Sequence, residues 1–196
     1  TPEINAGSMA DIAFLLLIFF LVTTTMNVDA GISRKIPQKQ DKQTDIIVNE
    51  RNILEVNINK KNELFVDGQT IQLKELKQIA IDFIDNGGGL DINKNPCDWC
   101  KGKKEKSSSD HPTKAIISIK TDRATDYGTY ISALDVLNAA YTHLRNKLST
   151  KLYHRNYESL LEDFKISNNS DKNIQEKIKL IRDKYPLLLS DAEINN

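Results

Sequence analysis

The apolar residues of this 196-residue chain are concentrated near its start. Ile12 to Val22 form eleven consecutive apolar positions, preceded by Asp11 and followed by three threonines. As a helix, residues 9–26 would extend over roughly 27 Å, close to the hydrocarbon thickness of a bilayer. The pattern therefore predicts a transmembrane helix over residues 9–26, after a short N-terminal cytoplasmic segment of residues 1–8.

A buried core helix and a cleaved signal peptide are the two alternatives for this apolar segment. A core helix is rarely apolar on every side for three turns. A signal peptide has a basic start and small residues at a cleavage site, and the flanks do not offer that combination well. Arg34 and Lys35 follow the segment, which by the positive-inside rule favours a cytoplasmic C-terminal side, but this charge count alone leaves the orientation open.

Beyond residue 26 the chain is polar and gives alternating strand and helix signals. Residues 27–52 are typical of a linker. The alternation of Leu54, Val56 and Ile58 predicts a strand, and Leu64–Val66 followed by Asp67-Gly68 completes a hairpin. A helix that ends before Gly87, a strand at residues 115–120 and a long helix after residue 126 follow. The apolar residues at helical spacing are Leu73, Leu76, Ala80, Phe83 and Ile84, then Tyr130, Leu134, Leu137, Tyr141 and Leu144.

Residues 151–196 carry the pattern of two further amphipathic helices, at 152–164 and 174–185. Their apolar residues offer a packing face, either for the domain that precedes them or for a second copy of the chain. Both possibilities, internal packing and a partner-binding or dimerising arm, stay open. The residues concerned are Leu160, Leu161, Phe164, Ile178, Ile181 and Leu187–Leu189.

Composition and charge exclude several classes of protein. The chain has 27 Lys and Arg against 27 Asp and Glu, so it lacks the concentrated positive charge that nucleic-acid binding needs. A hydrophobic content of 39% with only 8 Gly and 5 Pro is unlike disordered or fibrous chains. No Ser-His-Asp grouping, paired-carboxylate cleft or phosphate loop is evident, so we expect no enzyme activity and no cofactor.

Asp11 is the strongest candidate functional residue. An ionisable side chain within or at the edge of a membrane span is costly and by default indicates a functional site. A carboxylate that is charged when hydrated and neutral when buried can carry one proton across a barrier. Helical spacing places Ser8, Asp11 and Thr25 on one stripe, with apolar residues between. The alternative is that Asp11 only caps the helix at the water interface, where it would complement the N-terminal dipole.

The first forty residues resemble the N-terminal signature of the ExbD/TolR family. The segments Glu3-Ile4-Asn5 and Met9-Ala10-Asp11 precede the apolar run, and Val28-Asp29 and Ile36-Pro37 resemble the stretch after the family's membrane helix. The order strand–strand–helix–strand–helix resembles the family's small periplasmic domain. The resemblance implies a single N-terminal transmembrane helix and a small α+β periplasmic domain (53–150, with a loop insertion at 90–112), here with a helical C-terminal extension.

The resemblance also implies a function, in which the family's proton-carrying aspartate falls on Asp11. It implies a proton-channel (stator) subunit of the bacterial inner membrane that uses the proton motive force to energise TonB-dependent transport across the outer membrane. A charge crossing 100 mV releases about 2.3 kcal/mol, enough to bias a two-state assembly but small beside a covalent bond. Ser8, Thr23, Thr24 and Thr25 are possible polar relay residues, and the choice among the threonines stays open.

The partners implied by the resemblance are membrane and envelope proteins. They are an ExbB/TolQ-type multi-helix membrane protein, as a pentamer around a homodimer of this chain, and a TonB-type periplasm-spanning protein. Two other functions stay open. One is a membrane-anchored periplasmic binding or adaptor module, and the other is the stator of a related envelope or motility system.

Cys97 and Cys100, the only two cysteines, lie in the loop insertion. A C-x-x-C pair can be a redox motif, half of a metal site or a local disulfide. His111 could add a third metal ligand but no fourth is evident, so we expect no metal. In the periplasm that the resemblance implies, a disulfide is favoured. The lysines that follow suit a solvated loop, or contact with peptidoglycan or a partner; they are Lys101, Lys103, Lys104 and Lys106.

Overall fold

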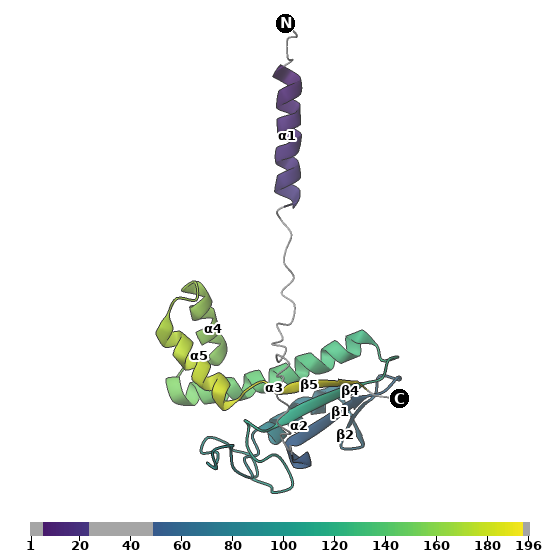
Figure 1. Cartoon of the computed structure of the whole chain (residues 1–196), viewed down its shortest axis with the longest axis vertical. Helices are drawn as coiled ribbons and strands as arrows, with labels where there is room; N and C mark the ends of the chain where they lie inside the picture. The colour runs from purple at the N-terminus through teal and green to yellow at the C-terminus, as the bar shows by residue number, and fades with distance from the viewer. Residues whose placement is uncertain (1–5, 24–48, 194–196) are drawn as a thin grey trace, which may run out of the picture. The chain divides into compact units, whose positions relative to one another are not determined.

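The computed structural model describes residues 6–23 and 49–193, and the chain divides into two units, residues 1–45 and 46–196. In the first unit, helix α1 spans Ala6–Thr23 (Figure 1). Its apolar side chains are exposed on every side of the axis, as Ile12 (60%) and Leu17 (59%) show. The predicted helix therefore forms over its described part.

Among the described residues, no helix is long and apolar enough to cross a membrane. The span expected at residues 9–26 thus stays a prediction, and its residues 24–26 lie outside the described part of the chain.

The second unit is built on a five-stranded mixed sheet. Its spatial order is β3-β2-β1-β4-β5, with β1 and β2 antiparallel, β2 and β3 antiparallel, and β4 parallel to both β1 and β5. Alternating residues of β1 point into the core, which gives the buried positions Leu54, Val56 and Ile58. The strands are β1 (Ile53–Ile58), β2 (Leu64–Val66), β3 (Gln69–Ile71), β4 (Ile116–Thr121) and β5 (Leu189–Glu193).

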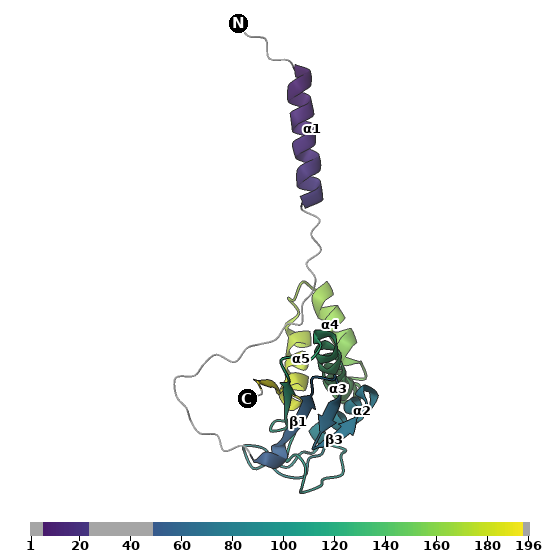
Figure 2. The ribbon, with the colours of Figure 1, turned by 90° about the vertical axis from the view of Figure 1, so that its right-hand side faces the viewer.

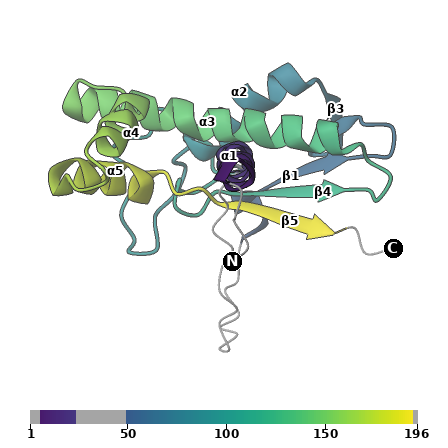
Figure 3. The ribbon, with the colours of Figure 1, turned by 90° about the horizontal axis from the view of Figure 1, so that it is seen from above.

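Two helices pack side by side on one face of this sheet, α2 (Leu73–Ile84) and α3 (Tyr127–Tyr153) (Figure 2; Figure 3). The Glu75 carboxylate accepts a hydrogen bond from the Gln72 backbone N–H at 2.8 Å, which fixes the start of α2. Asp126 caps α3 by accepting from the Thr129 N–H at 3.2 Å. The predicted α+β domain is therefore confirmed in outline.

A helical hairpin follows α3 and lies at one end of it (Figure 1). It consists of α4 (Tyr157–Ile166) and α5 (Lys172–Lys184). Tyr157 and Leu160 of α4 pack against Ile178 and Ile181 of α5 in a small core of their own. These apolar faces thus pack within the chain, which was the first of the two alternatives given by the sequence.

The C-terminal region that was expected to be a helical extension ends in a strand. Leu189–Glu193 form β5, which pairs in parallel with β4, with Leu189 opposite Ile117. The Ile117 N–H also donates to the Leu188 carbonyl at 2.9 Å. The strand escapes a pattern search because it lies at the sheet edge and its sequence, LSDAE, carries no clear apolar alternation.

The second unit begins within the predicted linker of residues 27–52. Glu50–Asn52 form a 3-10 turn immediately before β1, and Asn52 is buried. Residues 24–48 lie outside the described part of the chain.

A buried polar contact joins the C-terminal ends of α2 and α5. The Tyr185 hydroxyl donates to the Asp85 carboxylate at 2.6 Å, and the Lys101 backbone N–H donates to the same carboxylate at 3.2 Å. Burial, together with the nearby Asp85, raises the pKa of Tyr185 well above its usual range, so the phenol stays protonated and donating. Lys147 lies 4.0 Å away and is the cation closest to Asp85 among the described ion pairs.

We expect Tyr185→Phe to lower the free energy of unfolding by about 1–3 kcal/mol, because the buried Asp85 carboxylate loses its hydroxyl donor. Urea unfolding of the full chain in detergent, followed by Trp99 fluorescence, measures the change. Tyr127→Phe is the matched control, since Tyr127 is 73% exposed and should change stability by less than about 0.5 kcal/mol. Equal effects of the two variants would contradict the role given to the Asp85 contact.

Candidate functional site

Asp11 lies inside α1 rather than at its start. The helix begins at Ala6, and its first turn contains no acidic residue. At 1.5 Å per residue, Asp11 is about 7–8 Å along the axis from the first helical residue. Capping and dipole effects fall off within the first turn, so the capping alternative loses its geometric basis.

The other candidate relay residues are placed only in part. Ser8 and Thr23 belong to α1, but their side chains are not described, and Thr24 and Thr25 lie outside the described residues. The apolar positions that share the stripe of Asp11 are exposed, with Leu15 at 59% and Ile18 at 42%. Within α1, the described ionisable side chain is therefore surrounded along the helix by apolar ones.

In the second unit, the loop insertion packs onto the end of α2 and contains a local disulfide. Cys97 and Cys100 form a disulfide and are both buried. Gly87, at φ +62°, lies against this disulfide, where an added Cβ would come within 2.8 Å of the Cys100 Cβ. The position after α2 thus requires glycine both for its left-handed backbone and for space.

His111 does not join the cysteines in a metal site. Its Nδ1 lies 2.8 Å from the Thr113 hydroxyl, and its ring packs edge-on against Trp99, 5.2 Å between centroids. Burial lowers the pKa of His111, so the ring is held neutral. In the part of the chain that the structure describes, no group of three or more His, Cys, Asp or Glu side chains could hold a metal ion.

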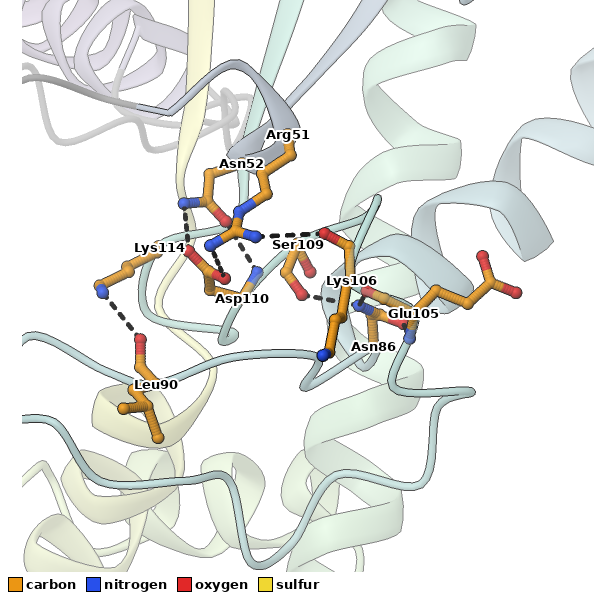
Figure 4. A network of polar contacts seen from close by, with 9 residues as sticks. All are labelled: Arg51, Asn52, Asn86, Leu90, Glu105, Lys106, Ser109, Asp110 and Lys114. Atoms are coloured by element: carbon orange, nitrogen blue, oxygen red, sulfur yellow. Dashed lines mark hydrogen bonds and ion pairs between the residues drawn. The ribbon is translucent and has the colours of Figure 1, made fainter.

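Asp110 anchors the C-terminal side of the insertion to the start of the sheet (Figure 4). Its carboxylate lies 2.7 Å from the Arg51 guanidinium and accepts from the Asn52 amide at 2.9 Å. The Asp110 backbone N–H returns a hydrogen bond to the Asn52 side-chain oxygen at 2.7 Å. These contacts hold residues 58 positions apart in one buried cluster.

Asn86 organises the middle of the insertion in the same way (Figure 4). Its amide donates to the carbonyls of Glu105 (2.9 Å) and Ser109 (2.7 Å), and its side-chain oxygen accepts from the Glu105 N–H at 2.9 Å. The Ser109 hydroxyl donates to the Phe83 carbonyl at the end of α2. All hydrogen-bonding groups of the Asn86 side chain are therefore used for structure.

The insertion also contacts α5. Lys184 lies over the Trp99 ring, with Nζ 3.5 Å from the ring centroid, a cation–π contact. The lysines of the run that follows the disulfide are exposed, as expected of a solvated loop; they are Lys101, Lys103, Lys104 and Lys106. The insertion is thus tied to both α2 and α5 while its lysines face solvent.

Sequence reasoning missed the polar anchors of this region. Arg51 and Asn52 lay in the expected linker, and Asn86 and Asp110 stood beside glycines and serines that suggested only loops. The contact between Asn52 and Asp110 spans 58 positions of the chain, and no local spacing indicates such a contact. The one signal in the sequence was the presence of polar side chains on both sides of the Cys97–Cys100 pair.

Comparison with protein families supplies the decisive observation. The family model described as biopolymer transport protein ExbD/TolR matches residues 1–151, more than half of the chain. The chain belongs to the ExbD/TolR family. A comparison with curated proteins finds no match.

Members of the ExbD/TolR family are, in general, inner-membrane, non-enzymatic components that energise biopolymer transport. They generally work with ExbB/TolQ and TonB/TolA partners. The ExbD/TolR match includes α1, the first four strands and the insertion, and it ends within α3. The α4–α5 hairpin and β5 lie beyond the matched residues.

We expect Cys97→Ser with Cys100→Ser to lower the free energy of unfolding by about 2 kcal/mol, because a disulfide that closes so short a loop constrains the unfolded chain only modestly. Urea unfolding monitored by Trp99 fluorescence tests this. Wild-type protein in reductant should match the double variant in oxidising buffer. Unchanged stability in both would show that the disulfide does not hold the insertion.

We expect Asp110→Asn to lower the free energy of unfolding by about 1–2 kcal/mol, because the buried anchor loses its charge toward Arg51, which is partly exposed. Lys103→Gln is the control: its pair with Glu105, at 3.9 Å, is exposed on both sides and should contribute less than about 0.5 kcal/mol. The same urea experiment compares them, and a larger loss for the control would refute the anchoring role.

Proposed function

We propose that this chain is the proton-carrying subunit of an ExbD-type stator complex in a bacterial inner membrane. Residues 1–8 would lie in the cytoplasm, residues 9–26 would cross the membrane, and the second unit would lie in the periplasm. Protonation and deprotonation of Asp11 would drive motion of the complex. The work would be passed to a TonB-type protein and used for transport across the outer membrane.

The position of Asp11 carries this proposal. It is an ionisable residue in the second turn of a helix whose following nine described side chains are apolar and exposed on all sides. A carboxylate there is not needed as a helix cap, and in an apolar environment it is stable mainly when protonated or paired. That is the behaviour required of a group that accepts a proton on one side and releases it on another.

The disulfide supports the periplasmic placement of the second unit. Disulfides persist in oxidising compartments such as the bacterial periplasm and are rare in the cytosol. Cys97 and Cys100 are paired and buried, which suits a structural bond better than exposed redox chemistry.

The proposed assembly is a homodimer of this chain inside a ring of ExbB/TolQ-type subunits, with five such subunits as the expected number. A ring that surrounds α1 would cover its apolar side chains on every face, including Phe14, Leu16 and Phe20, which are more than half exposed in the chain alone. A helix with apolar residues on one face only would not need such a surrounding partner.

We expect Asp11→Asn to abolish energised transport while leaving assembly with the ring subunits intact, because the amide keeps the size of the side chain but cannot carry a proton. Transport is measured in cells whose own copy of the chain is deleted. Proton flux is measured in liposomes that contain the chain and its ring subunit, with a pH-sensitive dye. Asp11→Glu is the matched control and should retain part of both activities.

Retained transport in Asp11→Asn, with normal assembly, would contradict the proton-carrying role. The membrane-anchor alternative makes the opposite prediction for the whole helix. If it holds, replacing residues 9–26 with an unrelated membrane helix preserves function. Proton flux without TonB-dependent transport would instead point to a stator of another envelope or motility system.

A further inference from the structure

The α4–α5 hairpin is an addition to the ExbD/TolR match and exposes charged side chains to solvent. It lies beyond residue 151, where the match ends, and projects at the end of α3 away from the sheet (Figure 1; Figure 3). Tyr157 and Leu160 of α4 are buried against Ile178 and Ile181 of α5, while Ile166 (80%) and Leu180 (40%) are exposed. The outer side of α5 is one of the exposed surfaces of this hairpin.

Four charged residues form a straight stripe along that side of α5. At 100° per residue they fall within an arc of about 60°. They alternate in sign, in the order Lys172, Glu176, Lys179, Asp183, and all four are exposed. In the part of the chain that the structure describes, no ion pair within 4.0 Å is found for any of them.

The same stripe lines a groove of about 600 Å³ between α4 and α5. Leu161 and Phe164 of α4 are half-buried and contribute the apolar part of this groove. The surface is therefore mixed: apolar along α4 and regularly charged along α5. Such a surface suits another helix with a matching charge pattern.

The order of charges from Lys172 to Asp183 is complementary to the same order read in the opposite direction. If a second α5 runs antiparallel and is related by a two-fold axis between residues 177 and 178, Lys172 faces Asp183 of the second copy. In the same register Glu176 faces Lys179 of the second copy. The symmetry then generates both reciprocal pairs, which is the condition for an isologous interface.

We propose that the α5 stripes of two copies of this chain pair antiparallel across a two-fold axis, so that the hairpin is a homodimer contact. Exposed ion pairs are individually weak, so this contact acts between copies that are already held together, where the effective concentration is high. It therefore rests on the homodimer of the proposed function and adds to it a specific surface in the second unit.

Pairing within a single helix is the competing explanation of the same charge order. Lys172 and Glu176 are four residues apart, as are Lys179 and Asp183, which is the spacing of intrahelical pairs. Lys172 and Asp183, by contrast, are roughly 16 Å apart along one helix and cannot contact each other. A charge exchange between these two residues therefore separates the explanations.

The test is cross-linking in the full chain, in membranes. Gln175→Cys places a thiol in the groove without removing a charge, and the two native cysteines are already paired and buried. A bifunctional maleimide should then link two copies. In this background, Lys172→Glu or Asp183→Lys puts like charges opposite each other, and each should lower the cross-linked fraction severalfold. The double variant should restore it.

Intrahelical pairing predicts the reverse for the double variant. The carboxylate introduced at position 172 would then lie one turn from Glu176, and the ammonium introduced at position 183 one turn from Lys179. Two repulsive pairs would add, and no recovery would occur. The proposal is overturned if the double variant does not recover the cross-linked fraction. It is also overturned if neither single variant lowers that fraction. Lys77→Glu, on the exposed side of α2, is the charge control and should leave the fraction unchanged.

Co-purification of two differently tagged copies of the chain separates this proposal from the proposed function. If the tagged copies co-purify but the Gln175→Cys variant gives no cross-linked dimer, the α5 contact is refuted and the stator homodimer is not. Tagged copies that do not co-purify refute the homodimer itself, and the α5 contact with it.

Discussion

Parallel pairing of β4 with both of its neighbours is the constraint on which the second unit depends. A strand can join a parallel neighbour only through a crossover connection that carries the chain back along the sheet. The connection from β1 to β4 contains β2, β3, α2 and the insertion, and the connection from β4 to β5 contains α3, α4 and α5. Both additions to the simple domain therefore lie in crossovers, where extra length leaves the strand register unchanged.

The Asp85 carboxylate joins these two crossovers. It accepts from Lys101 in the first and from Tyr185 in the second. Lys184, next to Tyr185, covers Trp99 of the insertion. The two added parts of the chain are thus connected to each other through the end of α2. Without the Lys101 contact of the insertion, the buried carboxylate would lose one of these two hydrogen-bond donors.

Hydrophobic runs, alternation and short motifs in the sequence predicted the elements that depend on neighbouring residues. The apolar run predicted α1, the alternation at Leu54, Val56 and Ile58 predicted β1, and the pair Cys97 and Cys100 indicated a local disulfide. The sequence could not indicate β5, whose partner is more than seventy residues away in the chain. Nor could it indicate the anchor at Asp110, because its contacts depend on the completed fold rather than on spacing.

Helix α1 has no amphipathic face, and this has a mechanical consequence. Every residue between Asp11 and Thr23 is apolar, so a rotation of the helix about its axis replaces one apolar surface by another. In an apolar surrounding, the energy of the helix therefore depends little on its rotation about its own axis, with one exception. Among the described side chains of α1, the carboxylate of Asp11 is the charged group that distinguishes one angle from the next. A surrounding protein that favours the charged carboxyl at one angle and the neutral carboxyl at another would make the preferred angle of the helix depend on whether Asp11 is protonated.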